Sequence, residues 1–100
     1  MKIYFEVISS LNIKIRTTEI HWNFITRHKH LEIDGMEKEV QETLIDPETV
    51  RVSQEDENVF LYYRKFSGHF VCVVCRHLNG DGFVITCYLT NKIKEGRQLW

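Results

Sequence analysis

The sequence predicts an α+β fold in which an N-terminal β-hairpin and two short helices pack on a four-stranded antiparallel β-meander. Three observations favour this fold. Residues 2–8 and 13–16 alternate between apolar and polar side chains, as strands do. Apolar residues recur at helical spacing between 18 and 46, and β-forming segments separated by turn residues fill most of the chain after 47. Helices followed by antiparallel strands are typical of a sheet covered by helices on one face.

The chain of 100 residues has the size of one domain, and its 43% hydrophobic content excludes a disordered protein. We therefore expect a single domain with one core. Its predicted parts are a β-hairpin over 1–17, a helical part over 18–46, an antiparallel sheet over 47–91 and a C-terminal tail over 92–100.

The first helix is predicted over about 18–28. Thr17 or Thr18 can cap its N-terminus, because a threonine hydroxyl accepts a hydrogen bond from a free backbone N–H of the first turn. Ile20 and Phe24, four residues apart, then share one face, as in a short amphipathic helix.

The second helix is predicted from the spacing of Met36, Val40 and Leu44, again four residues apart. Its other positions are rich in glutamate, so its outer face is acidic. The helix ends at Asp46, because a residue that precedes a proline avoids helical geometry.

The predicted sheet consists of segments 49–53, 58–66, 69–78 and 82–90. Ser67-Gly68 and the run 79–82 (NGDG) are typical of tight hairpin connections. Side chains alternate across a strand, so the last segment has two faces. We expect Phe83, Ile85, Cys87 and Leu89 on its core face, and Val84, Thr86, Tyr88 and Thr90 on the opposite, partly solvated face.

The cysteine count and the hydropathy indicate a cytoplasmic protein. Three cysteines are an odd number, which excludes a complete disulfide framework and favours reduced thiols. No apolar run approaches the roughly 18–20 residues that span a membrane, and the N-terminal segment alternates like a strand, unlike a signal peptide.

The net charge of −1 conceals an uneven distribution. Residues 1–31 carry a balance of +3, residues 32–58 a balance of −8, and residues 59–100 a balance of +4. All five histidines lie in the two basic segments. If these segments meet in the fold, they form a basic surface that suits an anionic ligand.

Cys72 and Cys75 form a C-x-x-C motif, with His77 two residues further on. The motif resembles a zinc or redox site, but residues three apart on a strand point to opposite faces, so the two thiols should diverge. Zinc needs about four convergent ligands. We therefore interpret the cysteines as buried apolar side chains and expect neither a metal nor a cofactor.

His28 and His30 follow the first helix and flank Lys29. Two interpretations remain open. The basic run can stabilise a helix C-terminus through the helix dipole. Alternatively, one histidine is a general acid or base, which an ordinary pKa near 6.5 suits at neutral pH.

Arg64, Lys65, Arg76, Thr86 and Tyr88 lie within the most apolar segments of the chain. Lysine and arginine are rarely buried without a partner. Either these side chains lie on a solvated sheet face with their apolar stems packed down, or they form a shallow groove that binds phosphate.

Several short motifs, in this order, resemble a known nuclease family. They are RHKH at 27–30, ETLIDPETV at 42–50, LYYRK at 61–65, the run 70–90 with VITCY at 84–88, and KIKEGRQLW at 92–100. The resemblance covers about four-fifths of the chain and is to the phage and bacterial nucleases of the barnase–EndoU–colicin–RelE fold. It implies a metal-independent ribonuclease, often a toxin that a cognate antitoxin or immunity protein neutralises.

The resemblance also implies roles for individual residues. His28 or His30 is expected to act as acid or base, Arg64 and Arg76 to contact the scissile phosphate, and Thr86 and Tyr88 to line the same groove. The expected substrate-binding residues are Tyr63, Lys65, His77 and Lys92. The predicted partner is single-stranded RNA. The alternative is a non-catalytic module that binds RNA or a protein with the same sheet.

Overall fold

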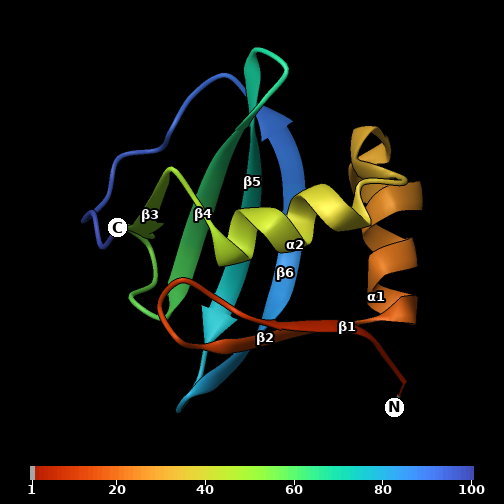
Figure 1. Cartoon of the computed structure of the whole chain (residues 1–100), viewed down its shortest axis with the longest axis horizontal. Helices are drawn as coiled ribbons and strands as arrows, with labels where there is room; N and C mark the ends of the chain where they lie inside the picture. Colours follow the sequence, from red (N-terminus) through yellow and green to blue (C-terminus); the bar gives the residue numbers. More distant parts are fainter. Residues whose placement is uncertain (1) are drawn as a thin grey trace.

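The computed structural model describes residues 2–100 and has the α+β architecture that the sequence predicts. Its elements, in chain order, are β1 (Ile3–Ile8), β2 (Lys14–Thr18), α1 (Glu19–Phe24), the π-helix η1 (Ile25–Lys29), the 3-10 helix η2 (Leu31–Ile33), α2 (Glu37–Ile45), β3 (Thr49–Val52), β4 (Val59–Phe66), β5 (His69–His77) and β6 (Asp81–Thr90). Figure 1 shows α2 crossing one face of the sheet, with α1 beside the end of that helix. No helix within residues 2–100 is long and apolar enough to cross a membrane.

The sheet differs from the predicted four-stranded meander, because within residues 2–100 it has six strands in the order β1-β2-β6-β5-β4-β3. The N-terminal hairpin extends the meander at the β6 side. Strand β2 runs parallel to β6 from the pair Lys14–Asp81 to the pair Arg16–Phe83, and all other neighbours are antiparallel. A parallel pair needs a long crossover, which the segment between β2 and β6 supplies. The two strands of the N-terminal hairpin are therefore part of the same sheet.

The first helix begins at a predicted cap, but its predicted apolar face is wrong, because Ile20 is 83% and Phe24 46% exposed. The Thr18 hydroxyl accepts a hydrogen bond from the His21 amide at 3.1 Å, so Thr18 is the N-cap. The helix then widens into a π-helix, where the Thr26 hydroxyl donates to the Trp22 carbonyl at 3.0 Å and the His30 amide donates to the Ile25 carbonyl at 2.7 Å. This wide turn ends the basic segment at His30.

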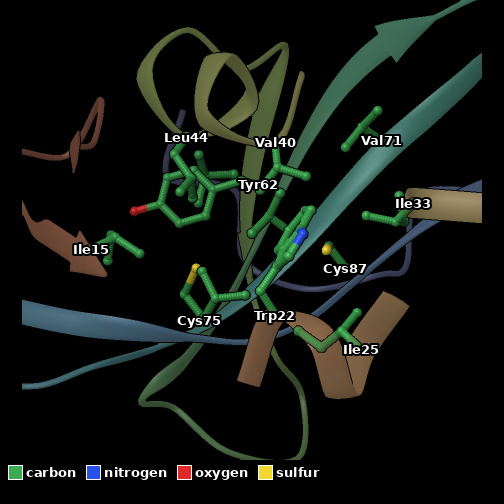
Figure 2. Close-up of a cluster of buried hydrophobic side chains, with 13 residues drawn as sticks. Ile15, Trp22, Ile25, Ile33, Val40, Leu44, Tyr62, Val71, Cys75 and Cys87 are labelled. Atoms are coloured by element: carbon green, nitrogen blue, oxygen red, sulfur yellow. The ribbon is translucent and has the colours of Figure 1, made fainter. Parts of the chain in front are cut away.

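The main core lies between the helices and one sheet face (Figure 2). Trp22 and Ile25 enter it from the first helical segment, Val40 and Leu44 from α2, and Tyr62 from β4. A second, smaller cluster lies on the other side of the sheet and consists of Leu61, Tyr63 and Cys72, with partly buried neighbours. We call the side that carries this second cluster the open face.

A β-bulge corrects the predicted faces of the last strand. Cys75 pairs with Val84 and Val74 with Thr86, so Ile85 is an extra residue in β6. The bulge reverses the alternation before it: Val84 is buried in the main core, whereas Phe83 is 37% exposed. After the bulge the prediction holds, because Cys87 is buried in the main core and Tyr88 packs on the second cluster.

The C-terminal tail, residues 91–100, runs from the end of β6 to the outer edge of β3 (Figure 1). The Lys94 amide donates to the Tyr63 hydroxyl at 3.1 Å, and Ile93 packs on the second cluster. Further on, the Val52 amide donates to the Arg97 carbonyl at 2.9 Å. A side chain on Gly96 would clash with the Val52 carbonyl oxygen, so glycine permits this close approach. The tail therefore covers part of the open face.

Candidate functional site

A groove of about 490 Å³ lies on the open face, between the tail and the loop after β3. Its floor contains the apolar side chains Leu61 and Val74. The residues lining it are Ser53, Gln54, Glu55, Val59, Leu61, Val74, Thr86, Tyr88, Lys94 and Glu95. The Thr86 hydroxyl is buried and has no hydrogen-bond partner within residues 2–100, so its capacity to hydrogen-bond is unused.

The β6 bulge determines where Thr86 lies. Because Ile85 takes up the extra position, Thr86 pairs with Val74 and shares its face. The ring of His21 supports the bulge, since its Nε2 lies 2.7 Å from the Ile85 carbonyl oxygen. A carbonyl only accepts, so Nε2 is the donor. His21 thus satisfies a backbone group that the bulge takes out of the ladder.

His30 does not line the groove, but it lies beside one residue that does. Its ring centroid is 5.3 Å from that of Tyr88, which lines the groove. Its Nδ1 lies 3.4 Å from a carboxylate oxygen of Glu32. Burial raises the pKa of Tyr88 well above its usual value, so that hydroxyl stays protonated and can donate. Of the predicted site residues, Thr86 and Tyr88 therefore line one groove, and His30 lies beside Tyr88.

His28 is separate from this group. Its side chain is exposed and its ring lies 5.7 Å from that of Phe24, on the outer surface of the helical segment. The Lys29 ammonium also lies over the Phe24 ring, at 5.8 Å. His28 and His30 are only two residues apart, but their rings contact different aromatic side chains.

The two predicted arginines are each engaged by a carboxylate. Arg64 Nη1 lies 3.1 Å from an Asp46 oxygen at the end of α2, on the side of the sheet that the helices cover. Arg76 Nη2 lies 2.6 Å from an Asp56 oxygen. A hydrogen bond from the Asn58 amide and the Arg76 guanidinium lower the pKa of Asp56. Neither arginine lines the groove.

The predicted substrate-binding residues are dispersed. Lys65 is exposed near α2, at the far end of β4, and Lys92 is exposed in the tail. His77 lies on the helix-covered side, with its ring 3.8 Å from that of Phe60 and its Nε2 3.0 Å from the Tyr62 hydroxyl. None of the three lines the groove.

Tyr63 lies on the open face but is completely buried beneath the tail, where its hydroxyl accepts from the Lys94 amide. Desolvation raises its pKa to about 12. Tyr63 therefore holds the tail, including Lys94, in place. Its ring is not exposed, so a base cannot stack on it.

The thiols of the C-x-x-C motif diverge as predicted. Cys72 belongs to the open-face cluster and Cys75 to the main core. Burial raises the pKa of Cys72 to about 11 and that of Cys75 well above its usual value. Within residues 2–100, no group of three or more His, Cys, Asp or Glu side chains is arranged to hold a metal ion.

Arg51, which was not predicted, does not line the groove either, but it lies next to a residue that does. It pairs with Leu61, a groove residue, and its Nε donates to the Thr49 hydroxyl at 3.2 Å. No carboxylate lies within ion-pair distance of it in residues 2–100, and it is close enough to Tyr63 to lower the pKa of that hydroxyl slightly. The alternation of TVRVS, with Val50 and Val52 buried, is the signal that could have identified Arg51 and Ser53 as open-face residues.

Comparisons with models of known protein families, with curated proteins and with solved structures found no match to this chain.

Proposed function

We propose that this protein is a metal-independent endoribonuclease that cleaves single-stranded RNA across the open face, as the family resemblance implies. One observation supports this proposal above the others. Thr86, with an unpartnered hydroxyl, lies in one groove with Tyr88 and Lys94, and the His30 ring lies beside that of Tyr88 at a tilt of 35°. Cleavage of this kind needs a base, hydrogen-bond donors and cations, and no metal.

Each residue has a role in the proposed reaction. His30 removes the proton from the ribose 2′-hydroxyl, which then attacks the adjacent phosphorus. Arg51 and the Lys94 ammonium stabilise the charge that develops on the phosphate oxygens. The hydroxyls of Thr86 and Tyr88 donate hydrogen bonds to the same oxygens, and Lys94 supplies a proton to the departing 5′-oxygen. Arg64 and Arg76, which are paired with carboxylates, have no part in this step.

The test compares two histidines. His30→Ala should reduce cleavage of single-stranded RNA by roughly 10²–10⁴-fold, the usual effect of losing a general base. His28→Ala is the matched control and should cleave at a rate within about twofold of wild type, because His28 is exposed on the outer helical surface. Cleavage is followed on end-labelled RNAs of mixed sequence. Equal losses in the two variants, or wild-type protein that leaves every RNA intact, would contradict the proposal.

A second candidate function is a non-catalytic module that binds a basic protein. Glu55 and Glu95 line the groove together with Lys94, so the groove carries more acidic than basic side chains. Such a groove suits a basic protein partner, which this chain would bind as an immunity or regulatory protein. Wild-type protein that leaves RNA intact, yet binds a basic partner less tightly after Glu55→Gln and Glu95→Gln, would favour this function over the nuclease.

A further inference from the structure

A second cavity opens where β2 and β6 separate. The two strands pair over only three positions, the last being Arg16 with Phe83, and the chain then turns directly into α1 after Thr18. The cavity that this separation leaves has a volume of about 280 Å³. It is lined by Arg16, Thr17, Thr18, His21, Phe83 and Val84. We call it the strand-gap pocket.

The ring of His21 is fixed in this pocket. Its Nε2 donates to the Ile85 carbonyl at 2.7 Å, and its ring stacks on Phe24 with a centroid distance of 6.4 Å. Because Nε2 carries the proton of the neutral ring, Nδ1 is a hydrogen-bond acceptor. No hydrogen bond to this Nδ1 occurs within the part of the chain that the structure describes. His21 therefore contributes to the pocket lining a fixed ring whose Nδ1 is an unused acceptor.

Three further features make the pocket suitable for a planar polar ligand. Thr17 is 3% exposed, and its hydroxyl has no hydrogen-bond partner within residues 2–100. Phe83 leaves 37% of its surface exposed, although it lies within a strand. The Arg16 guanidinium, held at 2.9 Å by Asp81, adds donors. An exposed ring, a free hydroxyl, an acceptor and a guanidinium together match a heteroaromatic base, which stacks and forms hydrogen bonds at its edge.

The pocket lies beside the groove on the open face. Phe83 lines the pocket and pairs with Arg76, whereas Thr86 lines the groove and pairs with Val74. Val74 and Arg76 are two residues apart on β5, a separation of roughly 6–7 Å. We propose that the strand-gap pocket binds the base of a nucleotide next to the scissile phosphate, with Phe83 as the stacking platform. This inference rests on the proposed function, because it makes the pocket a base-binding subsite of the same RNA.

Nucleotide binding tests this subsite without requiring catalysis. The full chain, with its aromatic side chains isotopically labelled, is titrated with each of the four nucleoside 3′-monophosphates and, separately, with inorganic phosphate. The ring resonances of His21 and Phe83 should shift and saturate with at least one nucleotide and stay unchanged with phosphate. Phe83→Ala should weaken that binding by roughly five- to 150-fold, the cost of losing one base–aromatic stack.

The control variant is Phe66→Ala, because Phe66 is 38% exposed at the far end of β4 and should leave the affinity unchanged. Phe83→Tyr keeps the ring and should restore the affinity that Phe83→Ala loses. No shift at His21 and Phe83 with any nucleotide, equal shifts with phosphate alone, or equal losses in the two alanine variants would each overturn the subsite. If nucleotides bind in this way but RNA stays intact, the pocket is confirmed as a nucleotide-binding site and the catalytic proposal is wrong.

Discussion

His77 is held between aromatic side chains on the helix-covered side of the sheet. Its ring stacks on Phe60, and its Nε2 meets the Tyr62 hydroxyl, which in turn lies 3.0 Å from the Ser9 hydroxyl oxygen. Ser9 and Tyr62 are both buried, so the three side chains link the N-terminal hairpin to β4 and β5. Desolvation lowers the pKa of His77 to about 4. This histidine is therefore a structural residue that stays neutral near pH 7.

His77 should make the protein less stable as the pH falls from 7 to 4. Between the ordinary histidine pKa near 6.5 and the folded value of about 4, the unfolded chain binds the additional proton. Acidification therefore lowers the free energy of unfolding. The pKa shift corresponds to a loss of about 3 kcal/mol, and because His77 is partly exposed we expect a loss on the order of 2 kcal/mol. Urea denaturation at several pH values measures this dependence. His77→Gln, which hydrogen-bonds but does not titrate, should flatten it, and parallel curves for the two proteins would refute the assignment.

At the scale of elements, the C-terminal tail links the sheet to the proposed site. It contributes Lys94 to the groove, covers Tyr63 and pairs with the edge of β3 through the bridge between Arg51 and Gln98. Its last residue is also tied down, since the Trp100 indole donates to the Pro47 carbonyl at 3.1 Å. The tail therefore packs against the open face and also forms part of the wall of the groove.

Removing residues 91–100 should expose one cysteine selectively. Cys72 lies in the open-face cluster that Ile93 helps to cover, whereas Cys75 and Cys87 belong to the main core on the opposite side. In the truncated chain, Cys72 should react with a thiol reagent at least tenfold faster than in the full chain, because its thiol gains access to solvent. Reaction rates at each cysteine are measured by mass spectrometry.

The truncated chain with Cys72→Ser is the control, and its two remaining thiols should react slowly. Unchanged reactivity of Cys72 after truncation would show that the tail does not cover the open face. Equal reactivity of all three thiols would show that the sheet needs the tail to fold, which contradicts a local cover.

At the scale of the whole molecule, local patterns predicted most of the elements. The cap at Thr18, the end of α2 before Pro47 and the divergence of Cys72 and Cys75 each follow from residues close in sequence. The parallel pairing of β2 with β6 does not, because it joins segments more than 60 residues apart and depends on backbone hydrogen bonds that any side chains permit. The contact of the tail with β3 cannot be predicted either, because it too depends on backbone hydrogen bonds between segments far apart in the sequence.

The candidate site was only partly predictable. Thr86 and Tyr88 follow from strand alternation, and His30 was one of two histidines that the sequence left as alternatives. The bulge at Ile85 leaves no pattern in the sequence from which it could be predicted. It nevertheless determines which face of the sheet each side chain of β6 occupies. The ion pairs of Arg64 and Arg76 depend on carboxylates that lie far away in the sequence, so their engagement could not be predicted from strand positions alone.

The chemistry of the RNA ends tests the central proposal most directly. Purified protein is incubated with a single-stranded RNA in excess EDTA, and the product termini are identified by mass spectrometry. Attack by the 2′-hydroxyl predicts fragments that end in a 2′,3′-cyclic phosphate and begin with a 5′-hydroxyl, formed by wild type and lost with His30→Ala. Fragments with 3′-hydroxyl and 5′-phosphate ends, or cleavage that stops in EDTA, would contradict a metal-independent reaction in which His30 activates the 2′-hydroxyl.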